Sequence, residues 1–457
     1  MSDFPLEVKI NGILSKVTVT GTSFRYQQGE TETELEYRDI IGFHNSPDAE
    51  KADTVSRKLY YIHSTQKGNK LEKKALHISG NKNEMEQLHD VIRENSKKVT
   101  GRPKTVVVFL NPIGGSANAQ SIYRNDIEPI LKMADITCEL IVSEKADHFK
   151  EVVKSFDFSP YDALVAIGGD GTFNEIICGL IHRKQIESGV NCDDNTTQLN
   201  AIDIPIAIIP AGTGNGLAGL AHGCIDVTTS TLHLLKGQTK DFPVFGNFCN
   251  NSLIGYSLMQ TGYGMFGDLM YNINFYRWMR KFRYVFVPLW FFLFKTVRQF
   301  DAEVTYEILQ DDVTKSLDEV SATKTVTEMT TITSTLALIS SRGLFVDCFF
   351  EEIESKDYAV VLTHKPTRVH KLLSSFIKMR SMSSKAEIDS LGCVSILPIT
   401  SMTVKVPKSE SAMDLLVNLD GEILKLSHPE ICIKFMPRTY KMFTSFERKE
   451  ASKEQRN

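Results

Sequence analysis

A single carboxylate, Asp170, stands in the glycine-rich segment Gly168-Gly169-Asp170-Gly171. The segment follows a short apolar run, residues 161–167, that is typical of a buried parallel strand, and it precedes apolar residues at helical spacing from Thr172 onward. Glycines in such a turn let the backbone approach a ligand, and the N–H groups at a helix N-terminus bind anions. An acid beside a phosphate cradle suits phosphoryl transfer, and the alternative is an ordinary turn in which Asp170 caps a helix.

Two more glycine turns follow strand-like runs. One is Asn111-Pro112-Ile113-Gly114-Gly115, and the other is Pro210-Ala211-Gly212-Thr213-Gly214-Asn215-Gly216. The carboxyl ends of parallel strands meet at one edge of a sheet, where open α/β sheets bind ligands. Three such turns at one edge favour a nucleotide site over unrelated loops. Neither a Walker A sequence nor a GxGxxG sequence at the first helix is present, so a different mode of phosphate binding is expected.

The elements that must position these turns alternate between strand and helix within residues 104–224. We expect strands at 105–110, 136–142, 161–167 and 204–210, with helices at 121–133, at 145–156 and from Thr172 onward. This rhythm predicts an α/β nucleotide-binding domain, in which helices cover both faces of a parallel sheet.

The flanking regions have a different pattern. Residues 1–98 alternate apolar and polar in short runs and end in a helical segment at 81–98, which predicts a pleckstrin-homology-like β module. Residues 225–445 predict a mostly β second domain that binds the lipid substrate. Its strands are expected at 253–259, 302–308, 336–339, 358–363, 402–406 and 431–435, and its polar segment 310–334 is expected to be a flexible loop.

Charge and composition set further expectations. The chain has 457 residues and a formal net charge of -4, which gives no reason to expect a nucleic-acid partner. Its eight cysteines form no CxxC pair, and its N-terminus has no signal-peptide pattern, so we expect a cytoplasmic protein with reduced thiols. The apolar run at 284–294 is too short to span a bilayer. Three alternatives remain for this run: an acyl-chain pocket, an interfacial membrane segment and core packing.

The turns NPIGG, IGGDGTFNEIICGL and IPAGTGNGLA resemble the nucleotide motifs of the diacylglycerol kinase catalytic superfamily. This resemblance runs from about residue 104 to 221 and continues more thinly toward the C-terminus. GYGMFGD at 262–268, the pair Arg277 and Arg283, and NLDGE at 418–422 resemble its sphingoid-lipid branch, which includes ceramide and sphingosine kinases. The resemblance implies a kinase that uses ATP and Mg²⁺ to phosphorylate a sphingoid lipid at a membrane surface, with peripheral membrane association. Phosphoinositide binding through the N-terminal module, near Lys67, Lys70, Lys73 and Lys74, is a further expectation, with a solvated lysine face as the alternative.

The resemblance also implies roles for individual residues. Asp170 would be the general base, and Asp420 would contact Mg²⁺. The residues implied to contact nucleotide are Asn111, Pro112, Gly114, Gly115, Ser143, Glu144, Lys145, Ala146, Asp147, Gly168, Gly169, Gly171, Thr172, Glu175, Gly212, Thr213, Gly214, Asn215, Arg277, Arg283, Asp420, Gly421 and Glu422.

Several of these residues have structural alternatives. Glu175 suits the N-terminal turn of a helix, where the dipole favours an acid. Arg277 and Arg283 would equally suit a basic surface that faces anionic lipid. Asp420 and Glu422 share a face if their segment is a strand, whereas a DG turn would separate them.

The identity of the lipid rests on Asp268 and Tyr263, which occupy the substrate motif. Similar sphingosine kinases carry a second acid two positions after the residue matched by Asp268, where this chain has Met270. A neutral amide lipid needs no second charge, so ceramide is favoured. The Gly212-Thr213-Gly214-Asn215 turn and the isolated cysteines depart from ceramide kinases. Sphingosine, diacylglycerol, a soluble substrate and a non-catalytic lipid-binding role remain alternatives.

Overall fold

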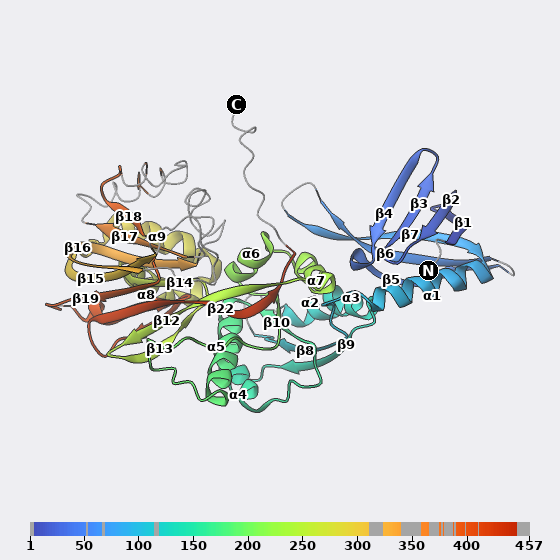
Figure 1. Cartoon of the computed structure of the whole chain (residues 1–457). Helices are drawn as coiled ribbons and strands as arrows, with labels where there is room; N and C mark the ends of the chain where they lie inside the picture. The colour runs from blue at the N-terminus through green and yellow to red at the C-terminus, as the bar shows by residue number, and fades with distance from the viewer. Residues whose placement is uncertain are drawn as a thin grey trace.

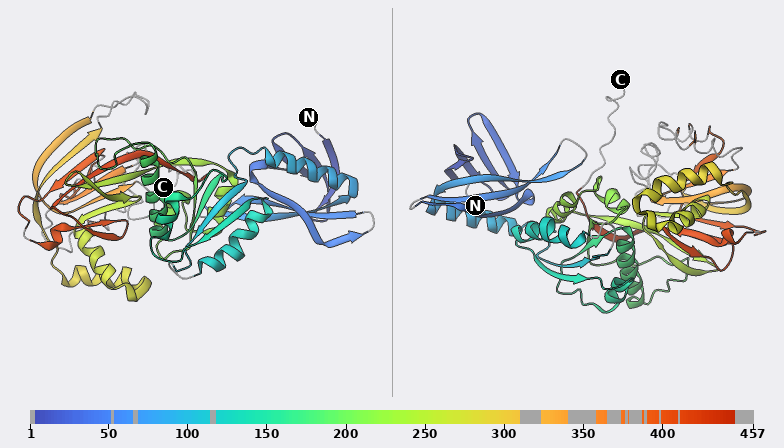
Figure 2. Two further views of the ribbon diagram at one scale, coloured as in Figure 1. Left: turned by 90° about the horizontal axis from the view of Figure 1, so that it is seen from below. Right: turned by 180° about the vertical axis from the view of Figure 1, so that it is seen from behind.

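The computed structural model describes residues 4–51, 54–65, 69–113, 118–309, 323–339, 358–364, 374–375, 378, 387, 390–397, 399–409 and 411–445. The molecule is elongated (Figure 1), with the N-terminal strands at one end and the strands of the second half at the other. Both views in Figure 2 show the same arrangement. The glycine turns lie in the part of the chain between these ends.

The N-terminal part is an antiparallel sheet closed by one helix. The sheet has the order β4-β3-β2-β1-β7-β6-β5. Met85, Leu88 and Ile92, the apolar face of α1, are buried against it, as the helical spacing predicts. The elements are β1 (Phe4–Ile10), β2 (Ile13–Val19), β3 (Ser23–Gln28), β4 (Thr31–Glu36), η1 (Tyr37–Asp39), β5 (Ile40–Lys51), β6 (Thr54–Ser64), β7 (Leu71–Asn81) and α1 (Lys82–Lys97).

The predicted parallel sheet is present, with β9-β8-β10-β11 as neighbours. Val107, Phe109 and their neighbours pack against α4 and α5 on one face, and the alternate residues pack against α3 and α7 on the other. The elements are β8 (Thr105–Leu110), α2 (Ala119–Ile122), the π-helical turn η2 (Tyr123–Ile127), α3 (Glu128–Met133), β9 (Thr137–Val142), α4 (His148–Ser155), β10 (Ala163–Gly168), α5 (Asp170–Glu187), β11 (Ile206–Pro210), α6 (Gly216–His222) and α7 (Val227–Lys236).

The second half joins this sheet instead of forming a separate one. The last strand, β22, pairs parallel with β11 at Ile206 and Met442 and antiparallel with β12 and β19. One sheet therefore runs through both halves. The remaining elements are β12 (Thr239–Cys249), β13 (Ser252–Ser257), β14 (Gln260–Gly264), α8 (Met265–Phe275), η3 (Arg277–Phe282), α9 (Arg283–Phe294), β15 (Phe300–Leu309), β16 (Thr323–Ile339), β17 (Tyr358–His364), β18 (Val394–Leu397), β19 (Ser401–Lys405), η4 (Ala412–Leu415), β20 (Leu416–Leu419), β21 (Glu422–Lys425) and β22 (Glu430–Phe443).

Strands dominate the second half, although α7 covers the parallel sheet and α8 and α9 follow β14. One expectation for this half needs correction. The expected loop 310–334 is wrong for its second part, since residues 323–334 belong to β16 and pair with β15 from Leu309 and Thr323 onward. Threonine is β-branched and favours strands, which outweighs the polar composition of this segment. Residues 310–322 lie outside the described part of the chain.

A buried histidine pair ties α6 to α7 and to the C-terminal segment. The rings of His222 and His233 stack with centroids 4.9 Å apart, and the Ser445 N–H donates to His233 Nδ1 over 2.9 Å. Burial lowers the pKa of His222 to about 4 and that of His233 still further, where the neighbouring His222 contributes as well. Both side chains are therefore neutral in the folded protein at pH 7.

These depressed pKa values make stability depend on pH. In the unfolded chain each histidine has a pKa of about 6.5 and binds a proton that the folded protein does not bind. The free energy of unfolding is therefore highest above that pH and declines as pH falls toward the folded pKa values. We expect each histidine to cost about 1 kcal/mol of unfolding free energy between pH 7 and 5.5. Thermal melts at several pH values across this range should show that the stability of His233→Asn depends less steeply on pH than that of the wild type. Equal slopes for both proteins would contradict the assignment.

Candidate active site

The turn around Asp170 connects two well-packed elements. All six residues of β10 are buried, and α5 begins directly after Gly169. A side chain at Gly168 would place its Cβ 2.6 Å from the Thr172 side chain, so only glycine fits at the strand end. The turn is therefore held by packing on both sides, which places Asp170 at the carboxyl edge of the sheet.

The second and third glycine turns are in backbone contact. A Cβ on Gly212 would lie 2.3 Å from Gly169 Cα, and the Ala211 N–H donates to the Gly168 carbonyl over 2.8 Å. Asn215 fixes the third turn internally, because its Oδ1 accepts from the Gly212 N–H and its Nδ2 donates to the Gly212 carbonyl. Asn215 is thus a scaffold for the turn in this structure.

The first glycine turn reaches the same place through Asn111. The Asn111 N–H donates to the Ile167 carbonyl over 3.0 Å, and its Nδ2 donates to Thr172 Oγ1 over 2.9 Å. Pro112 follows in the described chain, whereas Gly114 and Gly115 lie outside the described residues. The described parts of all three turns therefore meet at the start of α5, where sheet topology predicts a site.

The Asp170 carboxylate is held by the third turn. Its Oδ2 accepts from the Gly216 N–H and its Oδ1 from the Leu217 N–H, each over 3.0 Å. Asp170 therefore caps α6, a helix that follows it by 46 residues. A carboxylate oxygen has a second lone-pair site, so the cap leaves acceptor capacity for a ligand. Gly214 makes room for this contact, since a Cβ there would lie 2.8 Å from Oδ2.

Glu175 likewise accepts backbone N–H groups at the start of another helix. Its Oε1 accepts from the Phe149 N–H over 2.7 Å and from the Lys150 N–H over 3.2 Å, at the start of α4. Burial raises the pKa of Glu175, and these two hydrogen bonds oppose the shift. The expectation that Glu175 lies in the N-terminal part of its own helix holds, but its hydrogen bonds cap α4 instead.

The segment Ser143–Asp147 lies beside the first turn. The Ser143 N–H donates to the Leu110 carbonyl, and Ser143 Oγ donates to the Lys145 carbonyl over 3.0 Å. Glu144, Lys145, Ala146 and Asp147 are exposed, and Lys145 pairs with Glu151 over 2.7 Å. These side chains are accessible to a ligand at the same edge.

Asp420 and Glu422 are separated by a hairpin turn. Leu419 pairs with Glu422, and Asp420 and Gly421 both have positive φ, as a two-residue turn requires. The expectation that the two acids share a strand face is therefore wrong, and the DG-turn alternative describes the structure. Glu422 is exposed, whereas Asp420 is half-buried.

The hydrogen bonds of Asp420 disagree with the expected Mg²⁺ contact. Its oxygens accept from the backbone N–H groups of Leu258, Met259 and Gln260 and from Asn174 Nδ2. Burial raises the pKa of Asp420 to about 6 against these four bonds. All four donors would have to be displaced or shared for a metal to bind here. Asp420 instead ties the hairpin to α5, because Asn174 follows Asp170 by one helical turn.

The hairpin also holds the expected substrate helix, α8. Asn274 Nδ2 donates to the Gly421 carbonyl over 2.8 Å. Contacts therefore run from Asp170 along α5 to Asn174, through the Asp420 turn, and into α8, which carries Asp268. Asn174 and Asn274 were not among the predicted residues, and nothing in the local sequence marks either of them as bridging two halves of the chain.

Asp268 lies in a buried ionic cluster. Arg298 contacts both of its oxygens, with Nε to Oδ2 at 2.7 Å and Nη2 to Oδ1 at 3.0 Å, and also pairs with Asp414. Burial raises the pKa of Asp268, and the Arg298 contacts oppose that shift. Tyr263 donates its hydroxyl hydrogen to the Asp414 carbonyl over 2.6 Å. Sequence reasoning missed Arg298 and Asp414, which no motif connects to Asp268.

The two predicted arginines lie beyond α8. Arg277 belongs to η3, and its side chain lies outside what the structure describes. Arg283 Nη2 donates to the Tyr284 hydroxyl over 2.7 Å, and the guanidinium lies 4.7 Å from the centre of the same ring. No ion pair of Arg283 is present among the described residues. In the described chain, no group of three or more His, Cys, Asp or Glu side chains is arranged to hold a metal ion.

Comparisons with known proteins agree with the motif resemblance. Residues 105–246 match the family model of the diacylglycerol kinase catalytic domain. Human ceramide kinase is 36% identical over 202 residues, which cover 44% of this chain and 38% of that protein. Human sphingosine kinase 1 is 30% identical over 195 residues, 41% of this chain and 48% of that protein. The matched region thus spans less than half of either relative.

A solved structure shares the fold. A putative diacylglycerol kinase from Bacillus anthracis str. Sterne aligns with 75% of this chain and 98% of its own, with a TM-score of 0.52 and 15% sequence identity. At this identity the likeness concerns the fold alone. It includes residues beyond the family-model match, in keeping with a sheet that runs through both halves.

Proposed function

We propose that this chain, whose residues 105–246 match the diacylglycerol kinase catalytic domain, is an ATP-dependent lipid kinase that phosphorylates the primary hydroxyl of a sphingoid lipid, with ceramide favoured. One observation carries the proposal: the described parts of three turns meet at the start of α5, next to the Asp170 carboxylate, at the carboxyl edge of a parallel sheet. This is where α/β sheets bind ligands, and the backbone there is free of side chains that would keep phosphates away.

The proposed reaction needs few protein groups. Asp170 accepts the proton of the lipid hydroxyl while the oxygen attacks the γ-phosphorus of ATP and the bond to ADP breaks. The two N–H groups of α6 hold the carboxylate still, which favours a single productive orientation. Gly169, Gly171, Gly212, Thr213 and Gly214 supply the backbone around the phosphates. Mg²⁺ bound to these phosphates would neutralise the developing charge, and Glu422 is the exposed carboxylate of the nearby hairpin.

The buried ionic cluster supports an amide lipid over an amine. Sphingosine carries a cationic amine, which needs a carboxylate with a free face. Both oxygens of Asp268 are already bound by Arg298, and Asp268 is only 5% exposed. Met270 supplies no replacement charge. Ceramide, whose nitrogen is a neutral amide, requires none.

A substrate panel tests the proposed function. Purified chain with Mg²⁺ and ATP should phosphorylate ceramide with a kcat/KM at least tenfold above that for sphingosine or diacylglycerol. Labelled phosphate on each lipid, and on NAD as a soluble control, gives the measurement. Preference for sphingosine would overturn the assignment of ceramide but keep the kinase. Product on NAD alone, or on no acceptor, would overturn the lipid kinase itself.

We further propose that α9 and η3 contact the membrane that supplies the lipid. Val287 and Phe291 pack inward, and large apolar side chains cover the outer side, so the helix resembles an interfacial segment. Figure 2 shows the yellow helices of this region projecting from the body. No helix in the described chain is long and apolar enough to cross a membrane. The exposed residues are Phe275, Trp278, Phe282, Tyr284, Val285, Phe286, Leu289, Leu293 and Phe294.

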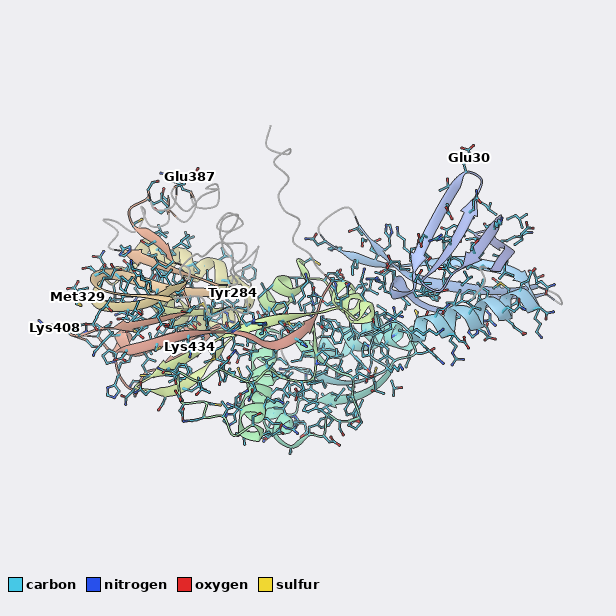
Figure 3. All side chains as sticks on the ribbon, in the orientation of Figure 1. Glu30, Tyr284, Met329, Glu387, Lys408 and Lys434 are labelled. Carbon is cyan, nitrogen blue, oxygen red and sulfur yellow. The ribbon has the colours of Figure 1, made fainter. Side chains whose placement is uncertain are left out.

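Charge substitutions on this face should weaken membrane binding. Phe286→Glu with Leu289→Glu is expected to reduce co-sedimentation with anionic vesicles at least tenfold, because carboxylates would have to enter the apolar boundary. Activity on a short-chain substrate below its aggregation concentration should persist. Met329→Glu, at an exposed position of β16 (Figure 3), is the control and should bind vesicles normally. Unchanged vesicle binding by the double variant would exclude this face.

The N-terminal module and the location of the protein complete the proposal. The topology of β1–β7 with α1 fits a pleckstrin-homology-like module covering residues 1–98, followed by catalytic and lipid-binding units that share one sheet. We also propose a cytoplasmic protein that associates peripherally with membranes, because its described cysteines are free thiols and α9 presents an exposed apolar face. Two of the lysines expected to bind phosphoinositide are engaged, since Lys70 lies 3.9 Å from Asp226 and Lys73 lies over the Tyr60 ring, whereas Lys67 lies outside the described residues.

A further inference from the structure

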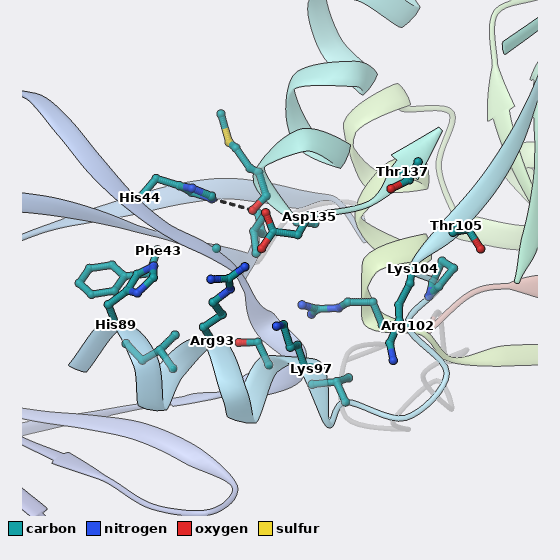
Figure 4. Close-up of a pocket in the computed structure, with 18 residues that line it drawn as sticks. Phe43, His44, His89, Arg93, Lys97, Arg102, Lys104, Thr105, Asp135 and Thr137 are labelled. Atoms are coloured by element: carbon teal, nitrogen blue, oxygen red, sulfur yellow. Dashed lines mark hydrogen bonds between the residues drawn. The ribbon is translucent and has the colours of Figure 1, made fainter. Parts of the chain in front are cut away.

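A cavity of about 530 Å³ lies where the N-terminal module meets the parallel sheet (Figure 4). Its volume suits a small ligand. One wall comes from β5 and from the C-terminal half of α1, which contribute His44, Arg93 and Lys97. The opposite wall comes from the link into β8 and the turn before β9, which contribute Lys104 and Asp135. We call this space the junction cavity.

The junction is a packed interface. Ile41, Ile62 and Leu71 of the module belong to the same hydrophobic core as the residues of α3 and α7. Arg102 reinforces it, because its guanidinium donates to the carbonyls of Ile40 and Arg38 on the module and to that of Leu235 on α7. The cavity therefore has fixed walls on both sides.

The cavity carries unpaired positive charge. Arg93, Lys97 and Lys104 form no ion pair or hydrogen bond through their side chains among the described residues, whereas one carboxylate, Asp135, lines the same space. His44 is bound to the Met133 carbonyl, and Arg102 is bound to backbone carbonyls. The charge of Lys104 also acts on Asp162, but Arg93, Lys97, Arg102 and Lys104 against one lining acid still give the space a net positive charge.

A buried side-chain oxygen beside the cavity lacks a hydrogen-bond partner among the described residues. The Ser96 hydroxyl oxygen is inaccessible to solvent and has no hydrogen-bond partner in the described chain, and Ser96 lines the cavity between Arg93 and Lys97. A buried hydroxyl without a partner is costly, so hydrogen bonding in this wall of the cavity is incomplete in the structure.

The junction cavity is separate from the candidate active site. Thr105 and Thr137, which line it, are the first residues of β8 and β9. The glycine turns follow the last residues of the parallel strands. The cavity therefore lies at the opposite edge of the sheet from Asp170.

We propose that the junction cavity binds a ligand with clustered phosphate groups, which bridges the N-terminal module and the catalytic sheet. Guanidinium and ammonium groups that converge on one space recognise phosphate through charge-assisted hydrogen bonds. The ligand would contact Arg93 and Lys97 from the module and Lys104 from the sheet side. Two sources share this chemistry: a soluble polyphosphate and the headgroup of a phosphorylated lipid.

Titration calorimetry with inositol hexakisphosphate tests the soluble source. Wild-type protein should bind it in the presence of a saturating non-hydrolysable ATP analogue, which occupies the nucleotide site, and affinity should fall as salt rises. Arg93→Glu with Lys97→Glu is expected to weaken binding at least tenfold. Lys405→Glu with Lys408→Glu carries the same change in charge and should bind as the wild type does. Lys405 ends β19, and Lys408 follows it at the other end of the molecule (Figure 3).

Vesicle binding separates the two sources. Loss of binding by the Arg93/Lys97 variant only on vesicles with phosphatidylinositol bisphosphate, and not with phosphatidylserine, would assign the cavity to a lipid headgroup. Loss with inositol hexakisphosphate alone would assign it to a soluble ligand. Equal binding of both probes by the cavity variant and the control would overturn the proposal. Lys97→Gln, at the exposed end of α1, repeats the test if the double variant does not fold.

Discussion

Asp170→Asn is expected to phosphorylate the lipid 10²- to 10⁴-fold more slowly than the wild type, with little change in KM for ATP. The amide cannot take the proton of the attacking hydroxyl, and a general base contributes about this much to rate. Steady-state kinetics with ceramide and ATP measure the effect. Stability should fall by only about 1 kcal/mol, because the amide oxygen still accepts one of the two N–H bonds of α6.

Asp162→Asn provides a matched control for the loss of backbone hydrogen bonds. Asp162 also accepts two backbone N–H bonds, from Lys104 and Thr105. It directly precedes β10 and so lies at the opposite edge of the sheet from the glycine turns. A similar small loss of stability with nearly full activity is expected. If both variants lost activity equally, Asp170 would be a structural cap and not the base.

Gly212→Ala should disrupt nucleotide binding through the backbone alone. The added Cβ would lie 2.3 Å from Gly169 Cα, so the second and third turns must separate. We expect ATP affinity to fall at least tenfold and unfolding free energy to drop by about 1–3 kcal/mol, the usual cost of overpacking. Equilibrium binding of an ATP analogue and thermal melts measure the two effects.

Gly219→Ala is the matched control for this substitution. Gly219 lies in α6, the helix that follows the third turn, and a Cβ there would meet Ile225 at an ordinary contact distance of 3.4 Å. Alanine also suits a helix interior better than glycine does. The control should bind ATP normally and be at least as stable as the wild type. Normal ATP affinity in Gly212→Ala would show that the contact between turns does not shape the site.

Local patterns in the sequence predicted much of the local structure and the place of the candidate site. Apolar runs such as residues 105–110 and 161–167 have the length and composition of buried strands, so β8 and β10 were predicted nearly to the residue. The glycine turns could be recognised for a similar reason. A backbone that closely approaches another group requires glycine at that position, and this requirement is visible in the local sequence. These patterns placed Asp170 at the correct edge of the correct sheet.

The contacts of the acids in this site depend on packing between segments far apart in the sequence. Asp170 caps α6, Asp420 accepts from four donors, and Asp268 is bound by Arg298, and the sequence did not identify any of these partners. Arg298 and Asp414 are 116 residues apart, and a pairing over that separation is set by the closure of the sheet. The residue type fixes the charge of a side chain, but the packing of the fold determines which group that side chain pairs with. The sequence therefore showed where chemistry is expected, and the fold decided which carboxylates remain able to perform it.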